Sequence, residues 1–313
     1  MGRYVLGRAA AMGATLFSVA LLIFLLLSVV PGDPARLAAG PEATPEVYEA
    51  IRDKLDLDHP WPVRFGRWLG GLIRGDAGVS LNYDRPVSEL VATGLSVTLP
   101  LAVLALTLAL LLGVPLGLMA ASRPGGAVDM ATVGVAQLGM ALPEFWLGLL
   151  LAGLVGVRWG ILPVGGFPGW EAPGLALLHL LLPAVALALP RAAYLARMVR
   201  GAVADVLSED YIRAAHAKGL SGFRVVLHHA LRNALVPVVT SGGLILARLF
   251  GGALVVENVF FLPGLGGFGL LGVHARDLPL VAGIAVVTAG LMVLASFTVD
   301  LAYGVLDPRI RRS

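Results

Sequence analysis

Residues Ala9–Val30 read AAAMGATLFSVALLIFLLLSVV, a stretch that contains no Asp, Glu, Lys or Arg. At a helical rise of about 1.5 Å per residue it would span roughly 33 Å, which is enough to cross the hydrocarbon core of a bilayer. The stretch exceeds the apolar part of a secretory signal peptide, which is typically about 7–15 residues long. We therefore expect an uncleaved first transmembrane helix.

Further apolar blocks of membrane-spanning length follow along the chain. The predicted spans are Leu95–Ala121, Met130–Val157, Leu175–Tyr194, Asn233–Val256 and Leu280–Leu301. Composition agrees, because 58% of the residues are hydrophobic and only 14% are charged, against roughly a quarter in soluble domains. We expect an all-α integral membrane protein with about six transmembrane helices, kinked at Pro115, Pro143 and Pro183.

The positions of Lys and Arg indicate the orientation, since cytoplasmic loops of membrane proteins are enriched in them. On one side of the predicted spans lie Arg3, Arg8, Arg123, Arg197, Arg200, Arg213, Lys218, Arg224, Arg232, Arg309, Arg311 and Arg312. We expect that side to be cytoplasmic, with both termini on it. Residues 31–94 also carry basic residues, but acidic ones outnumber them, and a segment of that length translocates largely regardless of charge.

These signals predict three parts of the chain. Residues 1–30 form the cytoplasmic N-terminus and the first transmembrane helix, and residues 31–94 form an extracytoplasmic segment with short amphipathic helices. Residues 95–313 form the transmembrane core.

Several classes of chemistry are excluded by composition and spacing. The chain has no cysteine, which removes disulfides, thiolate catalysis and Cys-ligated metals. None of the six histidines has metal-ligand spacing to a second donor, so no metal site is expected. An intramembrane protease would need a nucleophile with its base, and Ser241 has no histidine placed to serve it. The basic residues flank apolar blocks as topology signals do, so no nucleic-acid partner is expected.

A polar segment between the fourth and fifth predicted spans carries the start and stop signals of a helix. Ser208 is expected to be its N-cap, with Glu209 and Asp210 in the first turn. Lys218 falls in the last turn, and Gly219 follows the end. A stiff helix on the cytoplasmic side could transmit force from a soluble partner to the spans.

The same segment resembles a known family. Residues 209–220, EDYIRAAHAKGL, are similar to the cytoplasmic EAA loop of ABC importer permeases, although Arg213 stands where the motif has Glu. Residues 229–237, HALRNALVP, resemble its continuation in the dipeptide/oligopeptide/nickel family. Other motifs of that family recur in order, namely Pro31-Gly32-Asp33-Pro34, Pro143-Glu144-Phe145-Trp146, Glu257-Asn258-Val259-Phe260, Pro263-Gly264-Leu265-Gly266, Arg276-Asp277-Leu278-Pro279 and Leu306-Asp307-Pro308-Arg309-Ile310. The long segment 31–94 resembles the "B" permease of the pair.

The resemblance implies a type I ABC importer permease fold with an extracytoplasmic insertion after the first helix. It implies a cytoplasmic coupling loop at residues 195–232 that docks on an ATPase. The coupling residues that it implies are Glu209, Asp210, Tyr211, Arg213, Ala214, Ala215, Lys218, Gly219 and Leu220.

The resemblance also implies the partners and the location of the chain. They are a homologous second permease subunit, two cytoplasmic ATPase subunits and an extracytoplasmic substrate-binding protein, in the inner membrane of a prokaryote. ATP and Mg would be bound by the ATPases, so this subunit is expected to be non-catalytic and to hold no cofactor.

Two ionisable residues in apolar surroundings are candidates for the translocation path. Arg248 lies inside a predicted span, where a charged group is costly and is a functional candidate by default. It could face the path or pair with Glu144. An arginine on the path would repel a divalent cation and could bind a carboxylate, which favours di- and oligopeptides over nickel. An ion-coupled secondary carrier is the alternative of another class, but the internal repeats typical of such carriers are not evident.

Overall fold

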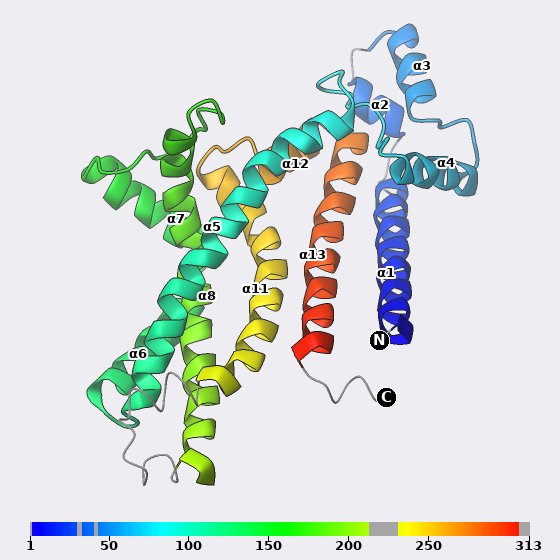
Figure 1. Cartoon of the computed structure of the whole chain (residues 1–313). Helices are drawn as coiled ribbons and strands as arrows, with labels where there is room; N and C mark the ends of the chain where they lie inside the picture. The colour runs from blue at the N-terminus through cyan, green and yellow to red at the C-terminus, as the bar shows by residue number, and fades with distance from the viewer. Residues whose placement is uncertain (1, 30–32, 41–42, 213–230, 307–313) are drawn as a thin grey trace.

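The computed structural model describes residues 2–29, 33–40, 43–212 and 231–306. Within these ranges the chain is helical apart from turns and one antiparallel bridge between Val79 and Pro86. The long helices are α1 (Gly2–Val29), α5 (Val87–Ser122), α8 (Pro173–Leu207), α11 (Leu231–Val259) and α13 (Leu278–Leu306) (Figure 1). The shorter ones are α2 (Pro34–Ala39), α3 (Pro45–Lys54), α4 (Trp61–Ile73), α6 (Ala127–Ala141), α7 (Glu144–Leu151) with its π-helical extension (Ala152–Arg158), and α12 (Leu265–His274).

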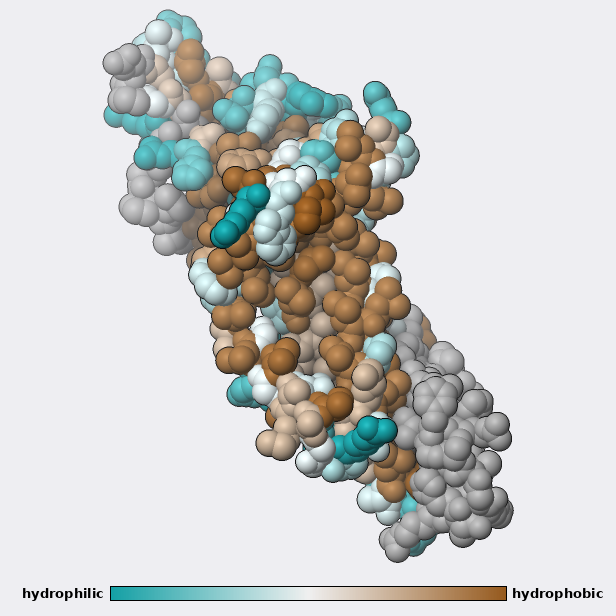
Figure 2. Space-filling model, turned by 90° about the vertical axis from the view of Figure 1, so that its left-hand side faces the viewer, coloured by the Kyte–Doolittle hydropathy of each residue, from teal (hydrophilic) through white to brown (hydrophobic). Residues whose placement is uncertain are grey.

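The long apolar helices match the predicted spans. Four helices in the described ranges are long and apolar enough to cross a membrane, and they lie at Val5–Ser28, Val87–Ser122, Pro173–Leu207 and Leu278–Val299. The 29-residue α11 covers the predicted span Asn233–Val256. Figure 2 shows hydrophobic residues over the middle of one face and hydrophilic residues gathered towards its ends. This distribution is the one that a bilayer requires.

The predicted span Met130–Val157 is wrong as a single helix. It consists of α6 and α7 with the π-helical extension, and the two parts are bent by 99° relative to each other. Leu142 is extended, with φ −83° and ψ 128°, and Pro143 is the N-cap of α7. A proline disfavours the helical conformation of the residue before it, so a full break replaces the predicted kink. Glu144 becomes the first residue of a helix.

The two longest helices extend beyond the predicted spans. α5 begins at Val87 and has 36 residues, and α8 continues to Leu207 and has 35 residues. Each is about 50 Å long, more than the roughly 30 Å of a hydrocarbon core. The end of the predicted segment 31–94 therefore belongs to α5, and the start of the predicted segment 195–232 belongs to α8.

Small residues bring α5 and α8 into close contact. Both helices carry buried small residues at every fourth position, namely Ala105, Ala109, Gly113, Gly117 and Ala121 on α5 and Ala184, Ala188, Ala192 and Ala196 on α8. A Cβ on Gly113 would lie 2.7 Å from the carbonyl oxygen of Ala192, and one on Gly117 would lie 2.6 Å from that of Ala196. Such contacts between backbones are typical of packed membrane helices.

Helices α2–α4 and the end of α8 lie at opposite ends of the described structure. In Figure 1, helices α2–α4 lie at one end, and the start of α1 and the ends of α8 and α13 lie at the other. That residues 31–94 and 195–232 lie on opposite sides of a membrane stays a prediction, as does the end that faces the cytoplasm.

Candidate functional site

An ion pair between a buried arginine and a partly buried glutamate joins the broken helix to the centre of the bundle. The carboxylate of Glu144, at the start of α7, pairs with Arg191 near the middle of α8. Arg191 is only 9% exposed, and it also donates a hydrogen bond of 3.4 Å to the carbonyl oxygen of Arg248 on α11. Gly252 makes room for the pair, since a Cβ there would overlap the Glu144 carboxylate. Three helices therefore meet at one ion pair.

The hypothesis that Arg248 pairs with Glu144 is wrong. In the described part of the chain Glu144 pairs with Arg191, and the side chain of Arg248 is exposed at the surface of this subunit. Sequence reasoning missed Arg191, although it lies inside the predicted span Leu175–Tyr194. An ionisable residue within a membrane span is itself the signal that could have found it.

A second carboxylate, that of Glu257, closes the turn that follows α11. It is fully buried, and it accepts hydrogen bonds from the Thr98 hydroxyl at 2.6 Å and from the Gly266 N–H at 2.7 Å. The Thr98 oxygen in turn accepts the Leu265 N–H at 3.0 Å. The side-chain amide of Asn258 donates to the carbonyl oxygen of Gly266 at 3.1 Å.

This network explains the two motifs around Glu257. Phe260, at the end of the first motif, and Leu262, between the two motifs, are buried, so the connection between α11 and α12 enters the protein interior. Side chains would not fit at Gly264 or Gly266, because a Cβ on the first would overlap the Glu257 carboxylate and one on the second the backbone of Leu254. The motif residues therefore hold the turn against α5 and α11.

Asp277 performs a similar role at the start of α13. It is fully buried and caps this helix by accepting the Leu280 N–H at 3.2 Å. Its other oxygen accepts the Ser80 hydroxyl at 2.5 Å and the Asn82 N–H at 3.0 Å. Asp277 thereby fastens the segment between α4 and α5 to the helical bundle.

A second ion pair lies towards the opposite end, where α6 packs on α8. Arg200 donates two hydrogen bonds to Asp129, at 2.9 Å and 2.8 Å. Asp129 is only 3% exposed and also accepts the N–H of Gly125 at 2.9 Å. Two parallel bonds from one guanidinium fix orientation as well as distance. The last turns of α8, which lead into the predicted coupling loop, are therefore braced against α6.

The described part of the coupling loop corrects one prediction. Ser208 is not the N-cap of a new helix but the C-cap of α8, and its hydroxyl donates to the carbonyl oxygen of Asp205 at 2.7 Å. A new helix does begin near the predicted place, because residues 210–212 are helical. Ile212 is buried against Val206 and Leu207, so the chain turns back onto the end of α8.

The predicted coupling residues are only partly described. Glu209 and Tyr211 are exposed at this turn, and Asp210 begins the new helix. The remaining predicted residues, Arg213, Ala214, Ala215, Lys218, Gly219 and Leu220, lie outside the described residues. Their roles stay predictions.

The arrangement of the helices defines the class of protein. A solved structure of the MetNI methionine ABC transporter in inward-facing conformations matches with a TM-score of 0.57, over 70% of this chain and 96% of that chain. At 20% identity this likeness shows the fold alone. The fold is that of a type I ABC importer permease, as the sequence predicted.

The chain belongs to the family of binding-protein-dependent transport system inner membrane components. The model of that family matches residues 113–312, and the model of its N-terminal region matches residues 1–102. The chain is thus an integral inner-membrane permease subunit of an ABC importer.

Curated relatives are similar over their whole length. A probable peptide ABC transporter permease protein of Sinorhizobium fredii is 41% identical over 99% of this chain and 100% of its own length. A putative peptide transport system permease protein of Brucella suis is 42% identical over 99% of both chains. The glutathione transport system permease protein GsiC of Salmonella paratyphi A is 40% identical over 99% of both chains.

Proposed function

We propose that this chain forms half of the translocation path of an ABC importer for di- or oligopeptides delivered by an external binding protein. The observation that carries the proposal is the end-to-end similarity of about 40% to permeases named for peptide and glutathione transport. Glutathione is itself a short peptide with free carboxylates. We infer a homologous second permease subunit for the other half of the path.

The arrangement of the chain supports a transporter in which this subunit forms part of the path and partner subunits hydrolyse ATP. The segment after α8 is proposed to dock on one of two cytoplasmic ATPases, which bind ATP and Mg and carry out the hydrolysis. The Arg200–Asp129 pair fixes the end of α8 to α6 and gives that segment a rigid base. This subunit is proposed to be non-catalytic.

The proposed orientation places both termini in the cytoplasm and residues 31–94 outside. It is supported by the basic residues near the predicted cytoplasmic ends and by the opposite positions of α2–α4 and the end of α8 (Figure 1). A membrane-impermeant thiol reagent should label a cysteine placed at Asn82 from outside. Labelling of a cysteine at Ala217 from outside would contradict the orientation.

Arg248 remains the proposed path residue of this subunit. Its side chain is exposed in the isolated chain, next to the Glu144–Arg191 pair, where a facing permease subunit would enclose it. Arg248→Glu should then depress uptake of substrates with a free carboxylate and spare neutral ones. An unchanged preference between the two would remove Arg248 from the path.

The substrate class is tested by uptake in cells that lack this chain and its close relatives. Cells with the restored chain should accumulate labelled dipeptides or glutathione, and an excess of unlabelled peptide should compete. Nickel uptake should not respond to the chain. Accumulation of nickel without peptide uptake would overturn the peptide assignment and leave the permease class intact.

A further inference from the structure

Helix α1 is attached to the rest of the subunit along one side only. Its main contacts in the described ranges are with α13, with a few to α4 (Figure 1). Only 6% of its apolar span is buried inside the chain. Most of α1 therefore faces lipid or another subunit.

Two cavities lie along the line where α1 meets α13. One, of about 290 Å³, is lined from α1 by Arg8 and Thr15 and from α13 by residues that include Ser296. The other, of about 270 Å³, is lined from α1 by Phe24, Leu27 and Ser28. Arg8 and Ser28 are separated by roughly 30 Å along the helix, which is the thickness of a hydrocarbon core. The two cavities thus lie towards opposite ends of the apolar span of α1.

The cavity beside α4 is apolar on one side and charged on the other. Its apolar wall comes from Phe24, Leu27, Trp68, Leu278, Pro279 and Ala282. Its charged residues are Lys54, Asp56, Arg64, Arg67 and Asp76, which leaves an excess of one positive charge. Trp68 suits the boundary between water and lipid, where tryptophan is enriched.

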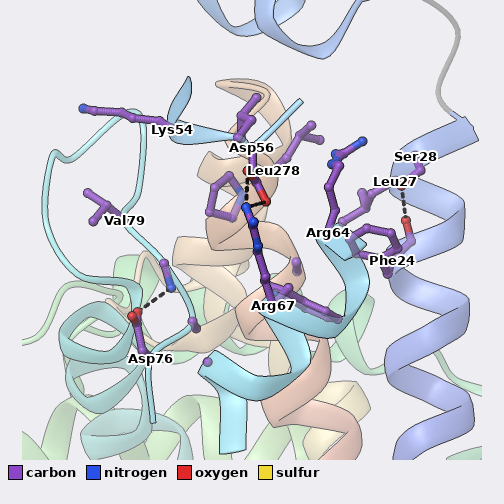
Figure 3. Close-up of a pocket in the computed structure, with 17 residues that line it drawn as sticks. Phe24, Leu27, Ser28, Lys54, Asp56, Arg64, Arg67, Asp76, Val79 and Leu278 are labelled. Atoms are coloured by element: carbon purple, nitrogen blue, oxygen red, sulfur yellow. Dashed lines mark hydrogen bonds and ion pairs between the residues drawn. The ribbon is translucent and has the colours of Figure 1, made fainter. Parts of the chain in front are cut away.

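Arg64 is the cation in this lining that forms no salt bridge with an acidic residue in the described part of the chain. Figure 3 shows Arg67 reaching Asp56, at 2.9 Å, and Lys54 binds Asp84 at 3.1 Å. Arg64 stands instead beside Phe24, with its guanidinium carbon 5.7 Å from the ring centre. Its Nε is buried and has no hydrogen-bond partner. A buried donor without a partner is costly, so an acceptor that is not part of this chain would stabilise the site.

We propose that this cavity binds the phosphate of an anionic phospholipid, held mainly by Arg64, with the acyl chains lying between α1 and α13. Phosphate oxygens accept short, charge-assisted hydrogen bonds from a guanidinium, and the apolar wall matches the start of the chains. The second cavity, at the other end of the same helix pair, shows that the contact between α1 and α13 leaves space towards both of its ends. A lipid here would fill the contact between α1 and the core. The inference rests on the membrane location and not on the transported substrate.

The proposal is tested by native mass spectrometry of the purified transporter released from detergent. The wild type should retain phosphatidylglycerol in preference to phosphatidylcholine, and Arg64→Gln should bind phosphatidylglycerol about tenfold more weakly, the effect of losing one charged hydrogen bond. Arg74→Gln is the matched control, because Arg74 is exposed at the end of α4 and does not line the cavity. Leu27→Trp should also weaken lipid retention by filling the cavity without changing its charge, and it serves if Arg64→Gln does not accumulate.

Three results would overturn the proposal. Equal phosphatidylglycerol retention by the wild type, Arg64→Gln and Leu27→Trp would show that the cavity holds no lipid. Arg64-dependent binding of inorganic phosphate, without preference for the lipid, would identify a free anion as the occupant. If Arg64→Gln and Leu27→Trp left lipid binding unchanged but weakened retention of the external binding protein, this surface would be identified as a protein contact.

Discussion

Replacement of Glu257 by alanine should destabilise the subunit strongly, whereas replacement by glutamine should not. The alanine variant removes the acceptor of two buried hydrogen bonds, at 2.6 Å from Thr98 and 2.7 Å from Gly266. Each buried donor left without a partner costs about 1–3 kcal/mol, so the expected loss is about 2–6 kcal/mol. Glutamine can accept the Gly266 N–H with its oxygen and donate to the Thr98 hydroxyl with its nitrogen, which keeps the loss to about 1 kcal/mol.

The two variants are compared by thermal unfolding of the purified subunit. The fraction of protein that stays monodisperse is measured after heating to each temperature. At about 2 °C per kcal/mol, Glu257→Ala should lower the midpoint by roughly 4–12 °C and Glu257→Gln by about 2 °C. Glu89→Ala is the control, since Glu89 is exposed and pairs with Arg85, an exposed residue just before α5. If glutamine were as damaging as alanine, the negative charge and not the hydrogen bonds would hold the turn. If alanine were harmless, the turn would be held by packing alone.

Three further predictions concern helix contacts. At Gly117 even a Cβ would lie within 2.6 Å of the α8 backbone, so the larger side chain of Gly117→Leu does not fit. The amount of this variant in membranes, measured on immunoblots, should fall severalfold. Gly134→Leu on α6 should accumulate normally, because no atom lies within 4 Å of a Cβ at that position. Asp277→Ala removes a buried acceptor from the loop before α5, so that loop should be cut faster by protease added outside; an unchanged rate would refute the link. Arg200→Gln and Asp129→Asn should each lower the thermal midpoint, and the double variant should lose no more than either single one; full additivity would contradict the pairing.

The helices were predictable because each depends on local hydrophobicity and length. The uncharged block Ala9–Val30 became α1, and the later blocks became α5, α8, α11 and α13. Their ends were predicted less well, because polar residues continue a helix outside the apolar zone without any local stop signal. α5 therefore begins at Val87 and α8 reaches Leu207.

The contacts between helices could not be predicted from local patterns. Pro143 signalled a bend, but the 99° angle depends on how α7 packs against the neighbouring helices. Glu144 was a candidate from the sequence, but its partner, Arg191 on α8, was not predicted. Glu257 and Asp277 were visible only as parts of short motifs, because their roles depend on residues more than 150 positions away in the chain.

The most direct test of the account measures peptide uptake into proteoliposomes that contain the complete transporter with its binding protein. Uptake should require ATP on the side where α8 and α13 end, and it should persist when ion gradients are dissipated. Gly219→Val, a change in the predicted coupling loop, should reduce uptake at normal abundance, because a β-branched residue would strain the left-handed conformation that the sequence predicts for Gly219 at the end of the loop helix. Uptake that follows an ion gradient without ATP would contradict the assignment of this chain as an ABC importer permease.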